Sequence, residues 1–172
     1  MNSCFYALTI AAMLAAGAGP AMSDQVKKQD LVGAWRYETR YIEFPDGHRE
    51  SQYGEHPQGL LIILPNGWYS HVIMRDDLPR YRSGNMQKAT EEEAQGVVAG
   101  SLPHFGTWTL DEREGTFIVH ILSSIFPNSV GQEHRRTILE LTKDRLHFVN
   151  EPGITGENAR VHATLSRLWK PD

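Results

Sequence analysis

The stretch LVGAWRYETR, residues 31–40, is the first part of the chain with the pattern of a folded strand. Its apolar and polar residues alternate, so an extended backbone places the apolar side chains on one face. Gly33 stands two positions before Trp35, and the alternation runs on to residue 44, where Pro-Asp-Gly at 45–47 predicts a turn. A Gly-x-Trp start fits the first strand of a closed barrel and also an ordinary buried strand, so the rest of the chain must decide.

Seven further apolar runs follow at short spacing, with turn residues between them. Asn66-Gly67 separates two of these runs and is the strongest local hairpin signal in the chain. With residues 33–44 the chain has eight predicted strands, the pattern of an antiparallel barrel or sandwich. The further predicted strands are residues 59–64, 68–75, 105–111, 115–124, 134–142, 145–150 and 159–170.

One short helix is predicted within this series of strands, over residues 89–102. Thr90 and Glu93 have the spacing of a capping box, and three consecutive glutamates lie in the first turn, where the helix dipole favours negative charge. Several strands are partly apolar on both faces. That is expected if one face packs on this helix and the other lines a cavity.

Length and composition indicate one ordinary globular domain. A chain of 172 residues is long enough to bury a single core, and 40% hydrophobic with 22% charged residues gives no sign of disorder. The net charge of −4 offers no general attraction to phosphate backbones or anionic lipid. We therefore expect no nucleic-acid partner.

The first 23 residues have the pattern of a secretory signal peptide. They carry no charged side chain, their apolar run is too short to span a bilayer comfortably, and Ala21 and Ser23 fit a cleavage before Asp24. A retained N-terminal anchor or a different start codon is the alternative. We expect a domain of residues 24–172 in the periplasm or outside the cell, without stable membrane insertion. The single cysteine, Cys4, would be lost with the signal peptide, which excludes disulfides and cysteine chemistry.

Four longer stretches resemble one known family. They are YGEHPQGLLIILPNGWYS (53–70), LPRYRSGN (78–85), EEEAQGVVAGSLPHFGTW (91–108) and SIFPNSVGQEHRR (124–136). In this order they resemble the lipocalin-like domain family of small bacterial and fungal proteins. The resemblance implies an all-β fold: a single eight-stranded antiparallel lipocalin-like (calycin-type) β-barrel with a central cavity, here with one short inserted helix. It also implies structural roles for Gly33, for Trp35 as a plug at one end, and for Arg167 packed over its indole.

Polar and aromatic residues on the predicted strands are candidates for binding a ligand. Arg75 and Arg136 can anchor a carboxylate, enol or phenolate through their guanidinium forks, although water-exposed arginines at the barrel rim would have the same pattern. His104 follows the helix and can lie at the barrel mouth. The full set of ligand-binding candidates is Tyr69, His71, Arg75, His104, Trp108 and Arg136.

His120 is the candidate catalytic residue if the protein is an enzyme. It lies in the otherwise apolar run FIVHILS, where it is either a general base in a pocket or a neutral core histidine. None of the eight histidines has the spacing of a known metal motif, so we expect neither a metal nor another cofactor.

Three functions are compatible with these sequence features. The favoured one is an exported, monomeric barrel that binds a small hydrophobic or aromatic molecule. The second is a cofactor-free cyclase, isomerase or hydrolase acting on a small hydrophobic, polyketide- or terpenoid-like substrate. The third is a periplasmic protein-interaction module whose barrel is filled by its own side chains. Fold alone does not separate them.

Overall fold

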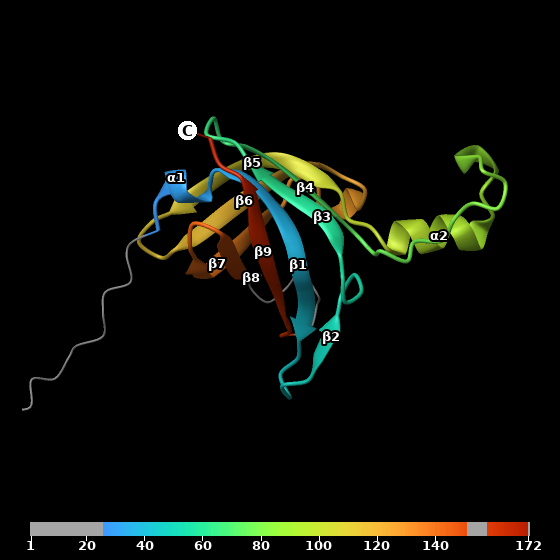
Figure 1. The fold of residues 1–172 in the computed structure, drawn as a ribbon, viewed down its shortest axis with the longest axis horizontal. Coiled ribbons are helices and arrows are strands. Elements are labelled where there is room, and N and C mark those ends of the chain that lie inside the picture. Colours follow the sequence, from blue (N-terminus) through green and yellow to red (C-terminus); the bar gives the residue numbers. More distant parts are fainter. Residues whose placement is uncertain (1–25, 151–157, 172) are drawn as a thin grey trace, which may run out of the picture.

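The computed structural model describes residues 26–150 and 158–171, and the expected signal peptide lies outside them. Eight strands form a closed antiparallel barrel in which each strand pairs with the next and β9 pairs with β1 (Figure 1). This confirms the predicted fold class. The barrel strands are β1 (Gly33–Glu43), β3 (Gln58–Ile63), β4 (Trp68–Met74), β5 (His104–Asp111), β6 (Thr116–Ser124), β7 (Glu133–Leu141), β8 (Arg145–Asn150) and β9 (Arg160–Trp169).

The remaining elements are short. Strand β2 (Arg49–Ser51) pairs only with the end of β1 and extends it as a hairpin beyond the barrel. Helix α1 (Lys28–Leu31) precedes β1, and two 3-10 turns, η1 (Met86–Lys88) and η2 (Pro127–Ser129), lie in connections. Of the helices, only α2 (Glu91–Ala99) was predicted.

Trp35 fills one end of the barrel. Its side chain is fully buried, and its indole Nε1 donates a hydrogen bond to the carbonyl oxygen of Leu31 at 2.9 Å. The guanidinium of Arg167 lies over the indole, 3.8 Å from the ring centroid. It donates to the carbonyl oxygens of Val32 at 3.0 Å and Asp30 at 2.7 Å. These bonds join β9 to the segment that enters β1.

Gly33 allows the two strands to meet at this end. Its φ is +143°, a backbone conformation that other residues adopt only under strain. A Cβ at this position would lie 2.3 Å from the carbonyl oxygen of Trp169. Below it, large buried side chains from neighbouring strands, including Leu61, Phe117 and Leu165, pack into a continuous core.

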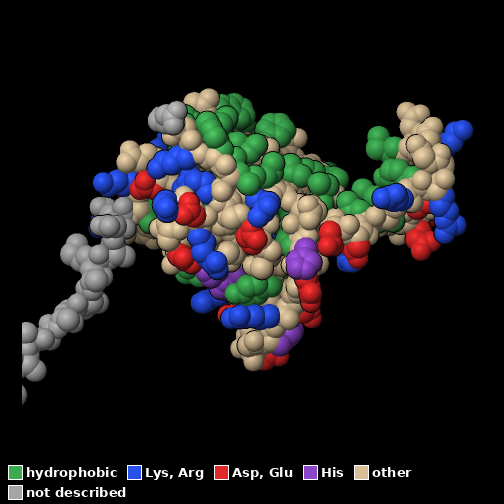
Figure 2. Space-filling model, viewed as in Figure 1, with side chains coloured by type: hydrophobic (Ala, Val, Ile, Leu, Met, Phe, Trp, Pro, Cys, Tyr) green, Lys and Arg blue, Asp and Glu red, His purple; other side chains and the backbone are tan. Residues whose placement is uncertain are grey.

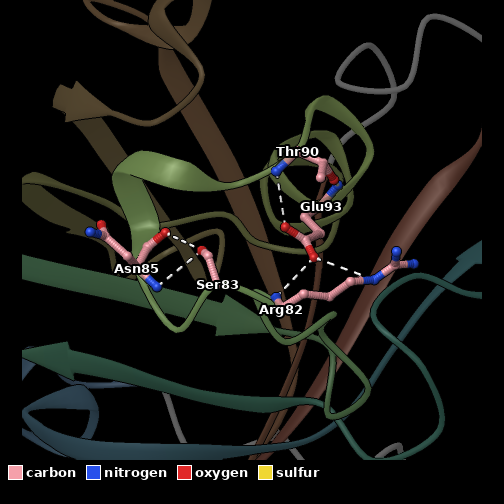
Figure 3. Close-up of polar contacts among 5 residues, drawn as sticks. All are labelled: Arg82, Ser83, Asn85, Thr90 and Glu93. Carbon is pink, nitrogen blue, oxygen red and sulfur yellow. Dashed lines mark hydrogen bonds and ion pairs between the residues drawn. The ribbon is translucent and has the colours of Figure 1, made fainter.

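The connection between β4 and β5 forms an arm that carries α2. The predicted capping box is present: the Thr90 hydroxyl accepts from Glu93 N at 3.3 Å, and the Glu93 carboxylate accepts from Thr90 N at 2.9 Å and from Arg82 N at 3.0 Å (Figure 3). Figure 1 shows α2 standing away from the barrel. The expectation that this helix covers a barrel face is therefore wrong.

Apolar side chains remain on the outer surface. Figure 2 shows them along the upper side of the barrel and on the arm. Exposed large apolar residues of the described chain include Trp68, Phe105 and Met86. No helix within residues 26–150 and 158–171 is both long and apolar enough to cross a bilayer.

Replacing the plug should cost a large part of the stability. Trp35→Ala removes a fully buried indole, and we expect the free energy of unfolding to fall by about 3–5 kcal/mol. Urea denaturation of residues 24–172 measures this loss. Trp68→Ala is the matched control, because Trp68 is 44% exposed and should cost about 1 kcal/mol or less. Equal losses in the two variants would contradict a plug role for Trp35.

Candidate functional site

A cavity of about 530 Å³ lies inside the barrel at the end opposite Trp35. Its walls are built from the ends of β1, β5, β6, β7 and β8 that lie away from the plug, together with the η2 connection. One side is apolar, with Leu102, Ile121 and Phe126. Much of the remaining wall is polar, and several of its side chains are charged. This polar lining includes Arg40, His104, Glu133, His134, Arg135, Arg136 and Asn150.

Arg136 is a buried cation with no anionic partner among the described residues. It points inward from β7, is 2% exposed, and lies against the rings of both Phe117 and Phe148, with its Cζ 5.4 and 5.3 Å from their centroids. Neither Nε nor Nη1 of Arg136 has a hydrogen-bond partner among the described residues. Burial lowers the pKa of Arg136, and cation–π contacts replace only part of the lost hydration.

Arg40 is a second buried cation in the same cavity. A β-bulge between Tyr37 and Thr39 shifts the alternation of β1, so that Tyr37 and Arg40 are the buried residues of this segment. Arg40 is 4% exposed, and its Nε donates to the side-chain oxygen of Gln52 at 2.6 Å. Its Nη1 has no hydrogen-bond partner among the described residues.

The charged residues that line the cavity are Arg40, Glu133, Arg135 and Arg136, and of these Arg40 and Arg136 are buried. No ion pair within residues 26–150 and 158–171 involves Arg40 or Arg136. A buried charge without a partner costs several kcal/mol, and proteins usually match such charges internally. Arg40 and Arg136 thus line one cavity as buried cations without a carboxylate partner among the described residues.

Tyrosine and histidine side chains form the wall of the lumen beside the arginines. The rings of His71 and His104 stack with centroids 4.2 Å apart, and the Tyr69 hydroxyl hydrogen-bonds to His104 Nδ1 at 2.9 Å. His71 donates from Nδ1 to the carbonyl oxygen of Leu102 at 3.0 Å. This bond leaves its Nε2 as an unprotonated acceptor, which has no partner within the described residues.

These histidines are neutral at physiological pH. Burial, reinforced by the charge of Arg136, lowers the pKa of His104 to about 2 and that of His134 to about 4. Burial likewise holds the pKa of His71 well below its usual value. For Tyr69, burial raises the pKa to about 12. The buried positive charge of this region therefore belongs to Arg40 and Arg136.

Four of the predicted ligand-binding residues come together in this region. Tyr69, His71 and His104 share one wall of the lumen, and Arg136 lies within electrostatic reach of all three. Of these four, Arg136 and His104 line the cavity itself.

The structure places three other predicted residues elsewhere. Arg75 follows the end of β4, is exposed, and pairs with Asp77 at 2.6 Å. Trp108 is buried at the plugged end, where its indole donates to the carbonyl oxygen of Leu64 at 2.9 Å. His120 lies on the outer face of β6, because Phe117, Val119 and Ile121 are the residues of that strand buried in the barrel. No group of three or more metal-ligating side chains lies together within the described residues.

Three residues of this region were not predicted from the sequence: Tyr37, Arg40 and Asn150. Tyr37 and Asn150 each stand two positions after a buried aromatic residue, Trp35 and Phe148, so strand alternation contains the signal for both. Arg40 has no such signal, since simple alternation from Trp35 points it outwards. Only the bulge turns it into the barrel.

Stability should fall as the pH is lowered from about 6.5. Unfolded histidines bind protons near pH 6.5, whereas His134 in the fold resists protonation until about pH 4. Over this window the unfolded state binds more protons, and each such histidine contributes a slope of up to about 1.4 kcal/mol per pH unit. Urea midpoints at pH 6.5, 6.0, 5.5 and 5.0 measure it. His134→Gln should flatten the slope, and His56→Gln, in an exposed loop, is the control. An unchanged slope in His134→Gln would contradict the buried neutral state.

Comparisons with known proteins identify the family of this chain. The model of a family described as a lipocalin-like domain matches residues 32–168. No curated protein matches the chain. Two redesigned β-barrels among the solved structures are 14% identical to it, with TM-scores of 0.39 and 0.38, covering 81% of this chain and 93% and 96% of their own. The second, mFAP1, is bound to DFHBI. With four-fifths of its length matched by the family model, the chain belongs to the family of lipocalin-like domains.

Proposed function

We propose that this barrel binds a small organic anion with an aromatic or short apolar body. The observation that carries the proposal is the pair of buried guanidiniums, Arg136 and Arg40, lining one cavity without a carboxylate partner among the described residues. An incoming carboxylate, enolate or phenolate supplies the missing negative charge. Leu102, Ile121 and Phe126 offer the apolar wall for the body of the ligand.

The polarity of the cavity refines the favoured hypothesis from the sequence. A purely hydrophobic molecule would leave Arg136, His134 and Asn150 without partners after displacing the solvent around them, which carries a free-energy penalty for each group. An anionic group against the arginines and an apolar body against Ile121 and Phe126 avoids that penalty. The proposed ligand is therefore amphipathic.

Electrostatics favour binding over acid–base catalysis. His120, the candidate base, lies on the outer face of the barrel. The histidines inside have lowered pKa values, and a group with a pKa of about 2 or 4 is a weak proton acceptor at neutral pH. The interaction-module hypothesis expects a filled barrel, whereas this one holds a cavity of about 530 Å³.

Export is a separate part of the proposal. The support is the uncharged, apolar leader pattern of residues 1–23 and the absence of cysteine from residues 24–172. Sequencing the N-terminus of the protein from fractionated cells tests it. A mature chain beginning at Asp24 in the exported fraction is the expected result, and an intact leader in the cytoplasm would refute export.

Charge recognition can be tested with two ligands of nearly equal shape. Phenylacetate carries the carboxylate, and phenylacetamide replaces it with a neutral amide. We expect calorimetric titration to detect phenylacetate and to find phenylacetamide at least about thirtyfold weaker, because only the carboxylate pairs with the guanidiniums. Equal affinities, or no binding of either, would refute the proposal.

Removing the central charge should change binding and stability in opposite directions. Arg136→Met keeps much of the side-chain volume, and we expect it to weaken phenylacetate binding at least about thirtyfold. The free energy of unfolding without ligand should rise by about 1–4 kcal/mol, because the variant no longer buries an unpaired charge. Arg145→Met, which removes an exposed arginine paired with Glu140, is the control for both measurements. A destabilised Arg136→Met variant that still binds would assign the arginine a purely structural role.

A further inference from the structure

Asn150 adds a second kind of polar group beside Arg136. It ends β8 with its side chain inside the barrel, is 2% exposed, and lines the cavity. In the register of β7 and β8 it stands directly opposite Arg136. Residues opposite each other in an antiparallel pair have Cβ atoms only about 4.5–5.5 Å apart. One ligand group can therefore reach both side chains.

The two side chains are not satisfied by each other. The amide oxygen Oδ1 of Asn150 accepts no hydrogen bond from any described residue, and the Nε and Nη1 groups of Arg136 donate none to this part of the chain. A buried acceptor thus stands next to buried donors, and each is left without a partner. Leaving such groups unpaired is costly, so a bound ligand that pairs with them gains affinity.

A simple carboxylate satisfies only one member of this pair. It is deprotonated at neutral pH, so it accepts from Arg136 and has no proton to give to the oxygen of Asn150. A hydroxyl group on the neighbouring carbon supplies that proton. The ligand then donates to Asn150 through the hydroxyl and accepts from Arg136 through the carboxylate.

We infer that the ligand is a 2-hydroxy carboxylate, with the carboxylate held by Arg136 and the hydroxyl donating to Asn150. The inference rests on the proposed function, because it specifies the chemistry of the same cavity. It adds a hydroxyl to the anionic group, and it assigns Asn150 as the residue that recognises it.

The arrangement also imposes handedness on the ligand. Arg136 and Asn150 fix the carboxylate and the hydroxyl from β7 and β8, while Ile121 of β6 and Phe126 in the connection after it supply apolar lining. Three different groups on one carbon then meet three different partners, and the mirror image cannot match all of them. One enantiomer is bound more tightly.

Three probes that differ at one carbon test this inference. Phenylacetate has a methylene beside the carboxylate, mandelate has a hydroxyl there, and phenylglyoxylate has a ketone that accepts and cannot donate. By calorimetry we expect one enantiomer of mandelate to bind about tenfold more tightly than phenylacetate, with phenylglyoxylate no tighter than phenylacetate. The second enantiomer should be weaker than the first.

The variant Asn150→Leu connects this selectivity to one side chain. It preserves approximate volume and removes the acceptor, so the ratio of the affinities for mandelate and phenylacetate should fall to about one. Asn85→Leu, on the arm, removes an amide away from the cavity and should leave the ratio intact. Circular dichroism and melting temperature report whether each variant folds, and if Asn150→Leu does not, the three probes on the wild-type protein decide alone.

The outcomes separate the two proposals. If phenylacetate and mandelate bind equally, the 2-hydroxy inference is overturned and the anion-binding function stands. The same holds if phenylglyoxylate binds tightest, since Asn150 would then act as a donor, or if Asn150→Leu retains the preference for mandelate. If none of the three probes binds, the proposed function itself fails.

Discussion

The packing of Arg167 on Trp35 determines where this barrel has room. The indole and the core below it fill the interior at one end, and the guanidinium joins the last strand to the backbone that enters the first. Closure at that end brings β1 and β9 together along their length, and the cavity lies at the opposite end. The position of the cavity therefore follows from the position of the plug.

One end of the barrel stabilises the folded state, and the other end destabilises it. Leu61, Phe117 and Leu165 bury apolar surface in the continuous core, which favours folding. Near the mouth, Arg40 and Arg136 bury charge without a matching carboxylate among the described residues, which opposes folding. Local conflict of this kind is typical of functional sites. In the absence of cysteine after residue 4, the apolar end must offset the cost without disulfides.

Strand pattern was sufficient to predict the strands, and the resemblance to lipocalin-like domains favoured a barrel over a sandwich. Alternation and turn residues predicted the eight barrel strands, and the capping box at Thr90 and Glu93 is present. The pattern was not sufficient to assign a single polar residue to the inner or the outer face of its strand. His120 lies on the outer face of β6, and Arg136 lies on the inner face of β7. Both strands are partly apolar on each face, so the decision depends on register and curvature, which arise only when all strands close together.

The bulge in β1 shows how one inserted residue can set the chemistry of a whole cavity. Glu38 is the extra residue, because Tyr37 pairs with Leu165 and Thr39 with Thr164 on β9. Deleting it would close the bulge and leave Arg40 facing inward opposite Ala163. If the extra residue lay instead on the mouth side of Arg40, regular alternation would turn the guanidinium to solvent without any change to the other walls. A shift of the bulge along β1 is thus a short evolutionary route between cavities with two buried cations and cavities with one.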